Sequence, residues 1–168
     1  MTRYPQRVTI QLHLLRHAHA GDPAAWDAPD ASRPLSEKGE RQADRMGRYL
    51  ARVGLAPDAV ITSPKLRAAR TAEIVALHLG VPVSTDPRLA GPLTLEDLEA
   101  ILVDAGSPLR PIVVGHDPDF SELLSWLAGA SSIPMKKGAL ARVDVEGPLA
   151  PGAGTLRWLL PPDLLPDH

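Results

Sequence analysis

Apolar runs alternate with helix-start signals along this chain, and this alternation constrains the fold more than any other feature. The runs at 8–15, 59–62 and 111–114 are rich in Val, Ile and Leu, and a Pro-marked helix start follows the last two. Such alternation predicts a mostly parallel sheet with helices on both faces. The carboxyl ends of parallel strands lie along one edge, where α/β proteins bind their ligands. We therefore expect the residues that follow these runs to converge.

Capping residues and glycines set the expected boundaries of the elements. Ser36 is typical of an N-cap, Thr94 to Asp97 resembles a capping box, and Ser63-Pro64 is typical of an N-cap with Pro at the first helical position. The expected strands span 8–15, 59–62, 81–85, 111–114, 139–145 and 155–160, the last two as a hairpin at the sheet edge. The expected helices start after Ser36, Ser63, Thr94 and Asp117 and end at Gly54, Gly80, Gly106 and Gly129.

Length and composition limit the class of protein. The 168 residues predict one domain over 1–168, with its core over about 8–160. The net charge of -2 gives no basic field, so we expect no nucleic-acid partner. The chain has no cysteines, which excludes disulfides, thiolate metal sites and cysteine-based phosphatase chemistry. No apolar run is long enough for a membrane span and the N-terminus lacks a signal-peptide pattern, so we expect a cytoplasmic protein with no membrane partner.

Two arginines and two histidines stand at the predicted strand ends: Arg16, His17, Arg67 and His116. Arginine suits a phosphoryl group because its planar fork donates two parallel charge-assisted hydrogen bonds and stays protonated. A neutral imidazole attacks phosphorus and also leaves readily, so a covalent phosphohistidine divides the transfer into two easier steps. His17 is therefore the candidate nucleophile, and Arg16 and Arg67 are the candidate phosphate clamps. His116 is placed to donate a hydrogen bond to the transferring group.

Three segments in this order resemble the histidine phosphatase superfamily: Arg16-His17-Ala18, Ser63-Pro64-Lys65-Leu66-Arg67-Ala68-Ala69-Arg70-Thr71-Ala72 and Val114-Gly115-His116-Asp117-Pro118. Within that superfamily, the small size and the segment Arg33-Pro34-Leu35-Ser36-Glu37-Lys38-Gly39 look like the compact SixA-type phosphohistidine phosphatases. The resemblance implies a three-layer, phosphoglycerate mutase-like α/β domain without a large cap insertion. It implies His17 as the nucleophile, Arg16 and Arg67 as clamps and His116 as the second catalytic histidine. It also implies that no metal and no other cofactor takes part.

The sequence departs from the superfamily pattern at one chemically important position. Many members place a Glu or Asp general acid after the third strand, where this chain has Arg88. Asp86 is the nearby carboxylate, and we do not assign it the role of the acid. Ala18, where the superfamily most often has Gly, is a second departure that we expect to be harmless.

Further residues have two interpretations each. Arg33 either lines the mouth of the pocket or is a solvated loop charge, and His19 is either a pocket residue or an exposed loop side chain. Both are candidate substrate-binding residues. Trp26 is either a pocket wall or a loop anchor. Lys136-Lys137 is a solvated pair, with steering of an acidic substrate as the alternative.

Several functions remain open from the sequence. We expect a monomer that acts on a phosphorylated protein, such as a histidine phosphotransfer domain, or on a small phosphate ester. A metal-dependent hydrolase competes for His17, His19 and Asp22, but Asp22 is one residue late and Pro23 follows it where that pattern has His. A non-catalytic phosphate-binding module is also compatible with the fold. Phosphoglycerate mutase activity is disfavoured because the segments that cap such sites have no room in 168 residues.

Overall fold

The computed structural model describes residue 4 and residues 8–167, which form one α/β domain. Its sheet has the strand order β3-β2-β4-β1-β5-β6. In chain order the strands are β1 (Thr9–Arg16), β2 (Ala59–Thr62), β3 (Val83–Thr85), β4 (Pro111–Gly115), β5 (Leu140–Glu146) and β6 (Gly154–Leu160). The first four strands pair with one another in parallel, whereas β5 runs antiparallel to β1 and forms the expected edge hairpin with β6. The predicted fold class is therefore confirmed.

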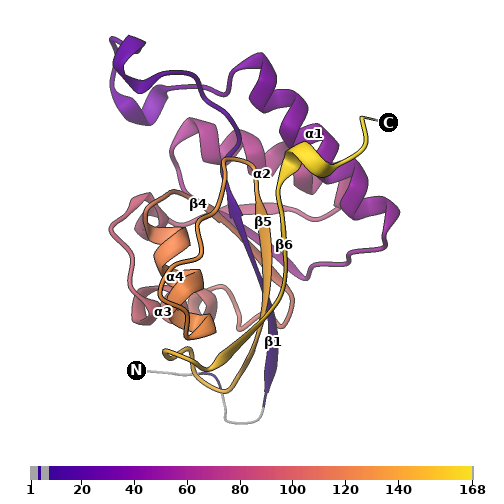
Figure 1. Ribbon diagram of the computed structural model, residues 1–168, viewed down its shortest axis with the longest axis vertical. Helices are drawn as coiled ribbons and strands as arrows, with labels where there is room; N and C mark the ends of the chain where they lie inside the picture. The colour runs from indigo at the N-terminus through magenta and orange to yellow at the C-terminus, as the bar shows by residue number, and fades with distance from the viewer. Residues whose placement is uncertain (1–3, 5–7, 168) are drawn as a thin grey trace.

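Helices cover both faces of the sheet, as Figure 1 shows. They are α1 (Glu37–Arg52), α2 (Leu66–Leu79), α3 (Leu95–Asp104) and α4 (Asp119–Ala128), with short 3₁₀ turns at η1 (Pro23–Ala25), η2 (Asp30–Ser32), η3 (Pro87–Ala90) and η4 (Pro162–Leu164). Alternate residues of β1 serve the two cores, because successive strand side chains point to opposite faces. Leu12 and Leu14 pack in the core that α3 and α4 cover, and Leu15 packs with α1 and α2.

The capping signals predicted most boundaries but failed at α2. Ser36 caps α1 by accepting from the Gly39 amide, and Thr94 forms the expected capping box. However, α2 begins at Leu66 with Lys65 as its N-cap, so the prediction that Ser63 caps this helix is wrong. The Ser63 hydroxyl instead lies 2.7 Å from the imidazole of His116, which the sequence pattern does not reveal.

Smaller boundary shifts occur elsewhere. The strand expected at 81–85 is shorter, at Val83–Thr85, and α4 begins at Asp119 with Pro118 as its N-cap.

Among the residues described, no helix has the length and the apolar character that a membrane crossing requires.

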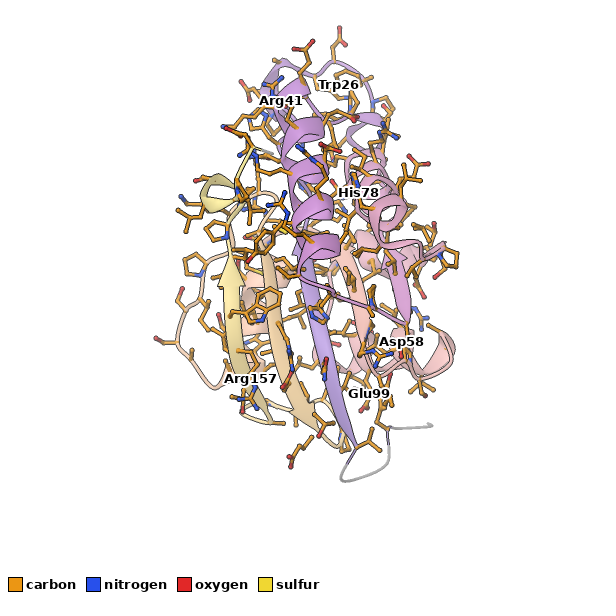
Figure 2. All side chains as sticks on the ribbon, turned by 90° about the vertical axis from the view of Figure 1, so that its right-hand side faces the viewer. Trp26, Arg41, Asp58, His78, Glu99 and Arg157 are labelled. Carbon is orange, nitrogen blue, oxygen red and sulfur yellow. The ribbon has the colours of Figure 1, made fainter. Side chains whose placement is uncertain are left out.

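The two ends of the sheet differ in their roles. Asp58, which precedes β2, accepts hydrogen bonds from the amides of Leu109 and Arg110 and closes the end where the parallel strands begin. Trp26 lies at the opposite end, beyond the carboxyl ends of those strands (Figure 2). The segment from 20 to 36 therefore lies beyond the carboxyl ends of the parallel strands, where the candidate residues were expected to converge.

Candidate active site

The carboxyl ends of three neighbouring strands bring the predicted residues together. Arg16 is the last residue of β1, Ser63 follows β2 and His116 follows β4. The His17 amide donates to the Gly115 carbonyl at 3.0 Å, which ties the turn after β1 to the end of β4. A Cβ atom at Gly115 would lie 2.6 Å from the ring of Phe120, so the close approach of α4 requires a glycine before His116. The rings of His17 and His116 lie 5.2 Å apart between centroids.

His17 is buried and held in one orientation. Its Nδ1 lies 2.8 Å from the carbonyl oxygen of Ala18, so Nδ1–H donates there and Nε2 keeps its lone pair. The Ala18 amide in turn donates to Thr71, whose hydroxyl donates to the Arg67 carbonyl. Burial, with further contributions from Arg67 and Arg16, lowers the pKa of His17 to about 4. At neutral pH the imidazole is thus uncharged, with a free nitrogen available as a nucleophile.

His116 is also uncharged, and hydrogen-bond counting fixes its tautomer. Its Nε2 lies 2.7 Å from the Ser63 hydroxyl oxygen, which already accepts from the Lys65 amide. Within the described chain the Ser63 proton has no other acceptor, so it donates to Nε2 and the ring proton of His116 resides on Nδ1. Burial, with the electrostatic influence of the neighbouring His17 imidazole next, lowers the pKa of His116 to about 3. His116 therefore presents a neutral N–H donor.

The two clamp arginines are held by protein oxygens at their outer nitrogens. Arg16 donates from Nη1 to the Met135 carbonyl at 2.7 Å and lies 3.5 Å from Asp117. Arg67, whose side chain is 7 % exposed, donates from Nη1 to the Asp30 carbonyl and from Nη2 to the Asp30 carboxylate, both at 2.9 Å. These contacts orient each guanidinium while leaving its inner nitrogen free.

Three buried donors of the site have no acceptor. Four buried side-chain nitrogen or oxygen atoms lack a hydrogen-bond partner within the described chain: Arg16 Nε, Arg67 Nε, His116 Nδ1 and His13 Nε2. His13 lies in β1 against Trp158, away from this cluster. Because buried donors without acceptors are costly, the first three make the site suited to a ligand with several acceptor atoms. A phosphoryl group supplies three such oxygens. We call the group formed by Arg16, His17, Arg67 and His116 the phosphate cradle.

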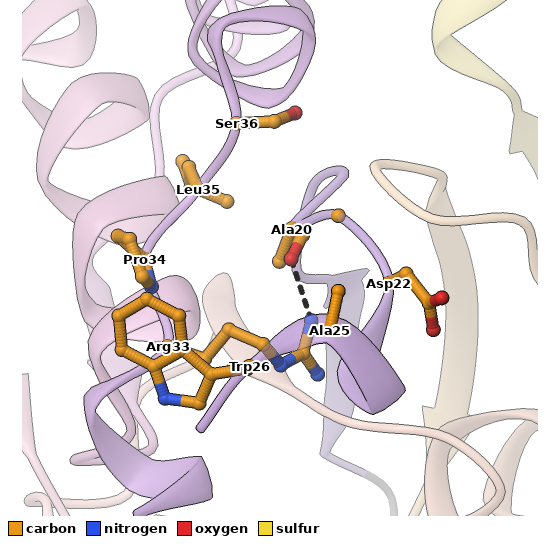
Figure 3. A pocket seen from close by; sticks show the side chains of 9 residues that line it. Ala20, Asp22, Ala25, Trp26, Arg33, Pro34, Leu35 and Ser36 are labelled. Atoms are coloured by element: carbon orange, nitrogen blue, oxygen red, sulfur yellow. Dashed lines mark hydrogen bonds between the residues drawn. The ribbon is translucent and has the colours of Figure 1, made fainter. Parts of the chain in front are cut away.

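Arg33 shares the carboxylate of Asp30 with Arg67 of the cradle, whereas His19 has no hydrogen bond to a cradle residue within the described chain. Arg33 is 6 % exposed, donates to the Ala20 carbonyl at 2.7 Å and lies 3.4 Å from Asp30, so it is not a solvated loop charge. Figure 3 shows it beside Trp26 in a hollow of about 260 Å³. His19 instead pairs with Ser36 at the start of α1, at 2.6 Å. Substrate binding by His19 stays a prediction.

The candidate carboxylates have distinct positions. Asp86 accepts from the Arg88 amide and from its guanidinium, and these bonds, led by the side-chain one, hold the Asp86 pKa below its usual value. It therefore caps η3 as an ionised group and has no proton to donate. Sequence reasoning missed Asp30, which lies directly on Arg67. An acidic residue in a proline-rich loop carries no periodic or capping signal that would have identified it.

The alternative of a metal site gains no support from the geometry. Residue 4 and residues 8–167 contain no cluster of three or more His, Cys, Asp or Glu side chains arranged to hold a metal ion. Asp22, the third member of the proposed ligand set, instead accepts from the Ala24 amide and caps η1.

The chain is similar in sequence and in fold to known histidine phosphatases. A family model described as the histidine phosphatase superfamily (branch 1) matches residues 12–91. An uncharacterized protein from Picosynechococcus is 36% identical over 122 residues, 71% of this chain and 73% of that protein. Phosphohistidine phosphatase SixA from Escherichia coli K12 is 29% identical over 158 residues, 91% of this chain and 94% of SixA. The structure of the protein histidine phosphatase SixA complexed with tungstate has a TM-score of 0.78 and 26% identity, covering 92% of this chain and 98% of that one.

Proposed function

Because this chain belongs to the histidine phosphatase superfamily and is a phosphatase, we propose that it hydrolyses phosphohistidine on proteins through a phosphohistidine intermediate of its own. The observation that carries the proposal is the set of three buried, unpartnered donors in the cradle that also contains the free Nε2 of His17. In this assignment His17 is the nucleophile, Arg16 and Arg67 are the clamps, and His116 is the neutral donor.

The proposed reaction uses each of these groups at a stated atom. Nε2 of His17 attacks phosphorus while its Nδ1–H remains bonded to the Ala18 carbonyl. The inner nitrogens of Arg16 and Arg67 and Nδ1 of His116 donate to the equatorial oxygens, on which negative charge is spread. As this bond forms, the P–N bond of the substrate breaks and its electron pair leaves with the imidazole nitrogen. A water molecule then attacks the phosphorus on His17, the bond from phosphorus to Nε2 breaks with its electron pair returning to Nε2, and the protons of the water stay on the released phosphate. Neutral His116 supplies its hydrogen bond without a protonation step.

The ionisation of the nearby carboxylate favours a nitrogen leaving group over an alkoxide. An alkoxide needs a proton as it leaves, and a well-placed general acid supplies ~10²–10⁴-fold in rate. Asp86 is tied to Arg88 and ionised, so it does not meet that need. Phosphohistidine protonated on its second ring nitrogen leaves as neutral imidazole and requires no acid. The same site is therefore better suited to P–N bonds than to alkyl esters.

The choice of a protein substrate over a small ester rests on the leaving-group chemistry of the site and not on the size of a pocket. The hollow of about 260 Å³ beside Arg33 is lined by residues 20–22, 25, 26 and 33–36 and by none of the four cradle residues. A small-molecule phosphomonoesterase is the second candidate, favoured by the position of Trp26 in this hollow, where it would contact an aromatic leaving group.

A turnover comparison tests the proposal. The wild-type protein is given a phosphohistidine-bearing phosphotransfer protein and a panel of alkyl and aryl phosphate monoesters, with and without a strong chelator. We expect the highest kcat/KM with the phosphohistidine protein, weak turnover of aryl esters and no effect of the chelator. Faster hydrolysis of an alkyl phosphate would establish the second candidate. Loss of activity with the chelator would contradict metal independence.

A further inference from the structure

Asp30 is an acidic residue at the phosphate cradle for which the proposed reaction has no role. Its Oδ2 lies 2.9 Å from Nη2 of Arg67 and 3.8 Å from the Lys65 ammonium, and its Oδ1 lies 3.4 Å from Nε of Arg33. Its carbonyl oxygen also accepts from Arg67. One aspartate thus contacts three of the cations that would attract a phosphorylated substrate.

Asp30 is ionised, so it is an acceptor and not a donor. The hydrogen bond from Arg67 holds the Asp30 pKa below its ordinary value, with the charges of Arg33 and Lys65 acting in the same direction. An ionised carboxylate accepts hydrogen bonds but has no proton to give. Asp30 therefore does not replace the missing general acid for an alkoxide.

Asp30 lies on the side of the cradle from which a leaving group departs. Its side chain is 54 % exposed, while the Arg67 side chain that it covers is 7 % exposed. It belongs to η2, in the segment that arches beyond the carboxyl end of β1 (Figure 1). In-line transfer places the leaving group opposite the attacking nitrogen of His17, which is buried. The leaving group of a protein substrate is therefore on the solvent side, where Asp30 has lone pairs to spare.

We propose that Asp30 determines substrate specificity by accepting a hydrogen bond from the free ring N–H of phosphohistidine. This inference rests on the proposed function. The lone pair of His17 Nε2 forms the new P–N bond, the P–N bond of the substrate breaks, and its electron pair stays on the departing ring nitrogen. The second ring nitrogen keeps its proton, so the ring leaves as neutral imidazole and no external proton is needed.

The carboxylate acts on this step in two ways. The carboxylate holds the proton on the second ring nitrogen. Without this proton, the ring would have to leave as imidazolate. Its negative charge also opposes leaving groups that become anionic, such as alkoxides and phenolates. Both effects favour substrates with a P–N bond over substrates with a P–O bond. Both depend on the negative charge of the Asp30 carboxylate and not on the position of Arg67.

Asp30→Asn separates the charge from the contact with Arg67. The amide oxygen of asparagine still accepts from Arg67, but the negative charge is gone. Wild-type and variant proteins are compared on a phosphohistidine peptide and on p-nitrophenyl phosphate. We expect the ratio of the two kcat/KM values to fall about tenfold in favour of p-nitrophenyl phosphate, the size of one lost charge-assisted hydrogen bond. Asp27→Asn, at an exposed aspartate of the same segment, is the matched control and should leave the ratio unchanged.

The pH dependence of kcat gives a second readout. The alkaline limb for the phosphohistidine peptide should move to lower pH in Asp30→Asn, because the bound ring loses its proton more easily, while the p-nitrophenyl phosphate profile keeps its shape. Equal losses with both substrates leave the ratio unchanged; they would show that Asp30 merely positions Arg67 and would overturn the inference, as would wild-type rates with both substrates. Failure of the wild type to hydrolyse the peptide would instead refute the proposed function, and the inference with it.

Discussion

The hydroxyl oxygen of Ser63 lies 2.7 Å from Nε2 of His116, and both side chains are buried. Because the described chain offers the Ser63 proton no other acceptor, this proton points to the imidazole. The ring proton of His116 is thereby placed on Nδ1, one of the three buried donors without an acceptor. Ser63, at the end of β2, thus decides which ring nitrogen of His116, at the end of β4, carries the proton that is offered to the substrate.

Removal of the Ser63 hydroxyl should weaken this arrangement. In Ser63→Ala we expect kcat to fall on the order of tenfold, because the His116 tautomer is no longer enforced and a buried acceptor is left unsatisfied. The ¹⁵N chemical shifts of His116 should move toward a tautomer mixture. Ser63→Thr keeps the hydroxyl and should restore the wild-type shifts. Unchanged kcat and shifts in Ser63→Ala would contradict the assignment.

Substitution of His17 should abolish turnover without unfolding the protein. In His17→Ala the nucleophile is missing, while the cradle arginines keep their contacts with Met135 and Asp30. Wild-type enzyme quenched during turnover of labelled substrate should carry a phosphoryl adduct that is labile in acid and stable in base, and His17→Ala should carry none. An acid-stable phosphoserine, or normal turnover of the variant, would refute the covalent role of His17.

The two arginines of α2 should respond differently to the same conservative change. Arg67 is buried at Asp30, whereas Arg70 is exposed and pairs with Glu40 and Glu73. Arg67→Lys keeps the charge but loses the fork, so we expect kcat/KM to fall by ~10²-fold or more. Arg70→Lys should stay within about twofold of the wild type, because exposed ion pairs contribute little. A larger loss in Arg70→Lys would contradict the orientation of the helix.

Stability should decline on the acid side of neutrality. His17 has a pKa of about 4 in the folded protein, and an unfolded histidine titrates near pH 6.5. Between these values the unfolded chain binds more protons, so the free energy of unfolding falls as the pH drops through this window, by at most roughly 3 kcal/mol for His17. Urea unfolding at several pH values between 7 and 4 measures the slope. His17→Gln should make it shallower, and an identical slope would argue against neutral burial.

The rate of aryl phosphate hydrolysis should depend steeply on the leaving group. Without a proton donor, the leaving phenolate carries the developing charge, so kcat/KM should decrease strongly as the pKa of the phenol rises. A series of substituted phenyl phosphates measures this slope in the wild type. A flat dependence would reveal a general acid, and Asp86→Asn and Asp30→Asn would then identify which carboxylate carries the proton.

Local sequence signals were sufficient to predict the strands of the sheet and the convergence of the four cradle residues. The apolar runs before Arg16 and His116 and the caps at Ser36 and Thr94 depend on contacts within a few residues, so they can be interpreted without the fold. Convergence of the strand ends then follows from parallel pairing alone, which the order β2-β4-β1 realises. The Asp86 and Arg88 pair shows the limit of this reasoning, since the sequence placed both near the site but not in contact with one another.

Long-range contacts, in contrast, were decided by the tertiary structure alone. Ser63 resembles a helix cap in the sequence, yet its partner is His116, 53 positions away. Asp30 has no distinguishing signal in the sequence, and only the folded course of its loop brings it into contact with Arg67. The sequence determined which side chains stand at the carboxyl ends of the strands, because strand ends are set by local pattern. The fold decided their protonation, their orientation and their anionic neighbour, because burial and hydrogen bonding between distant segments exist only once the chain has packed.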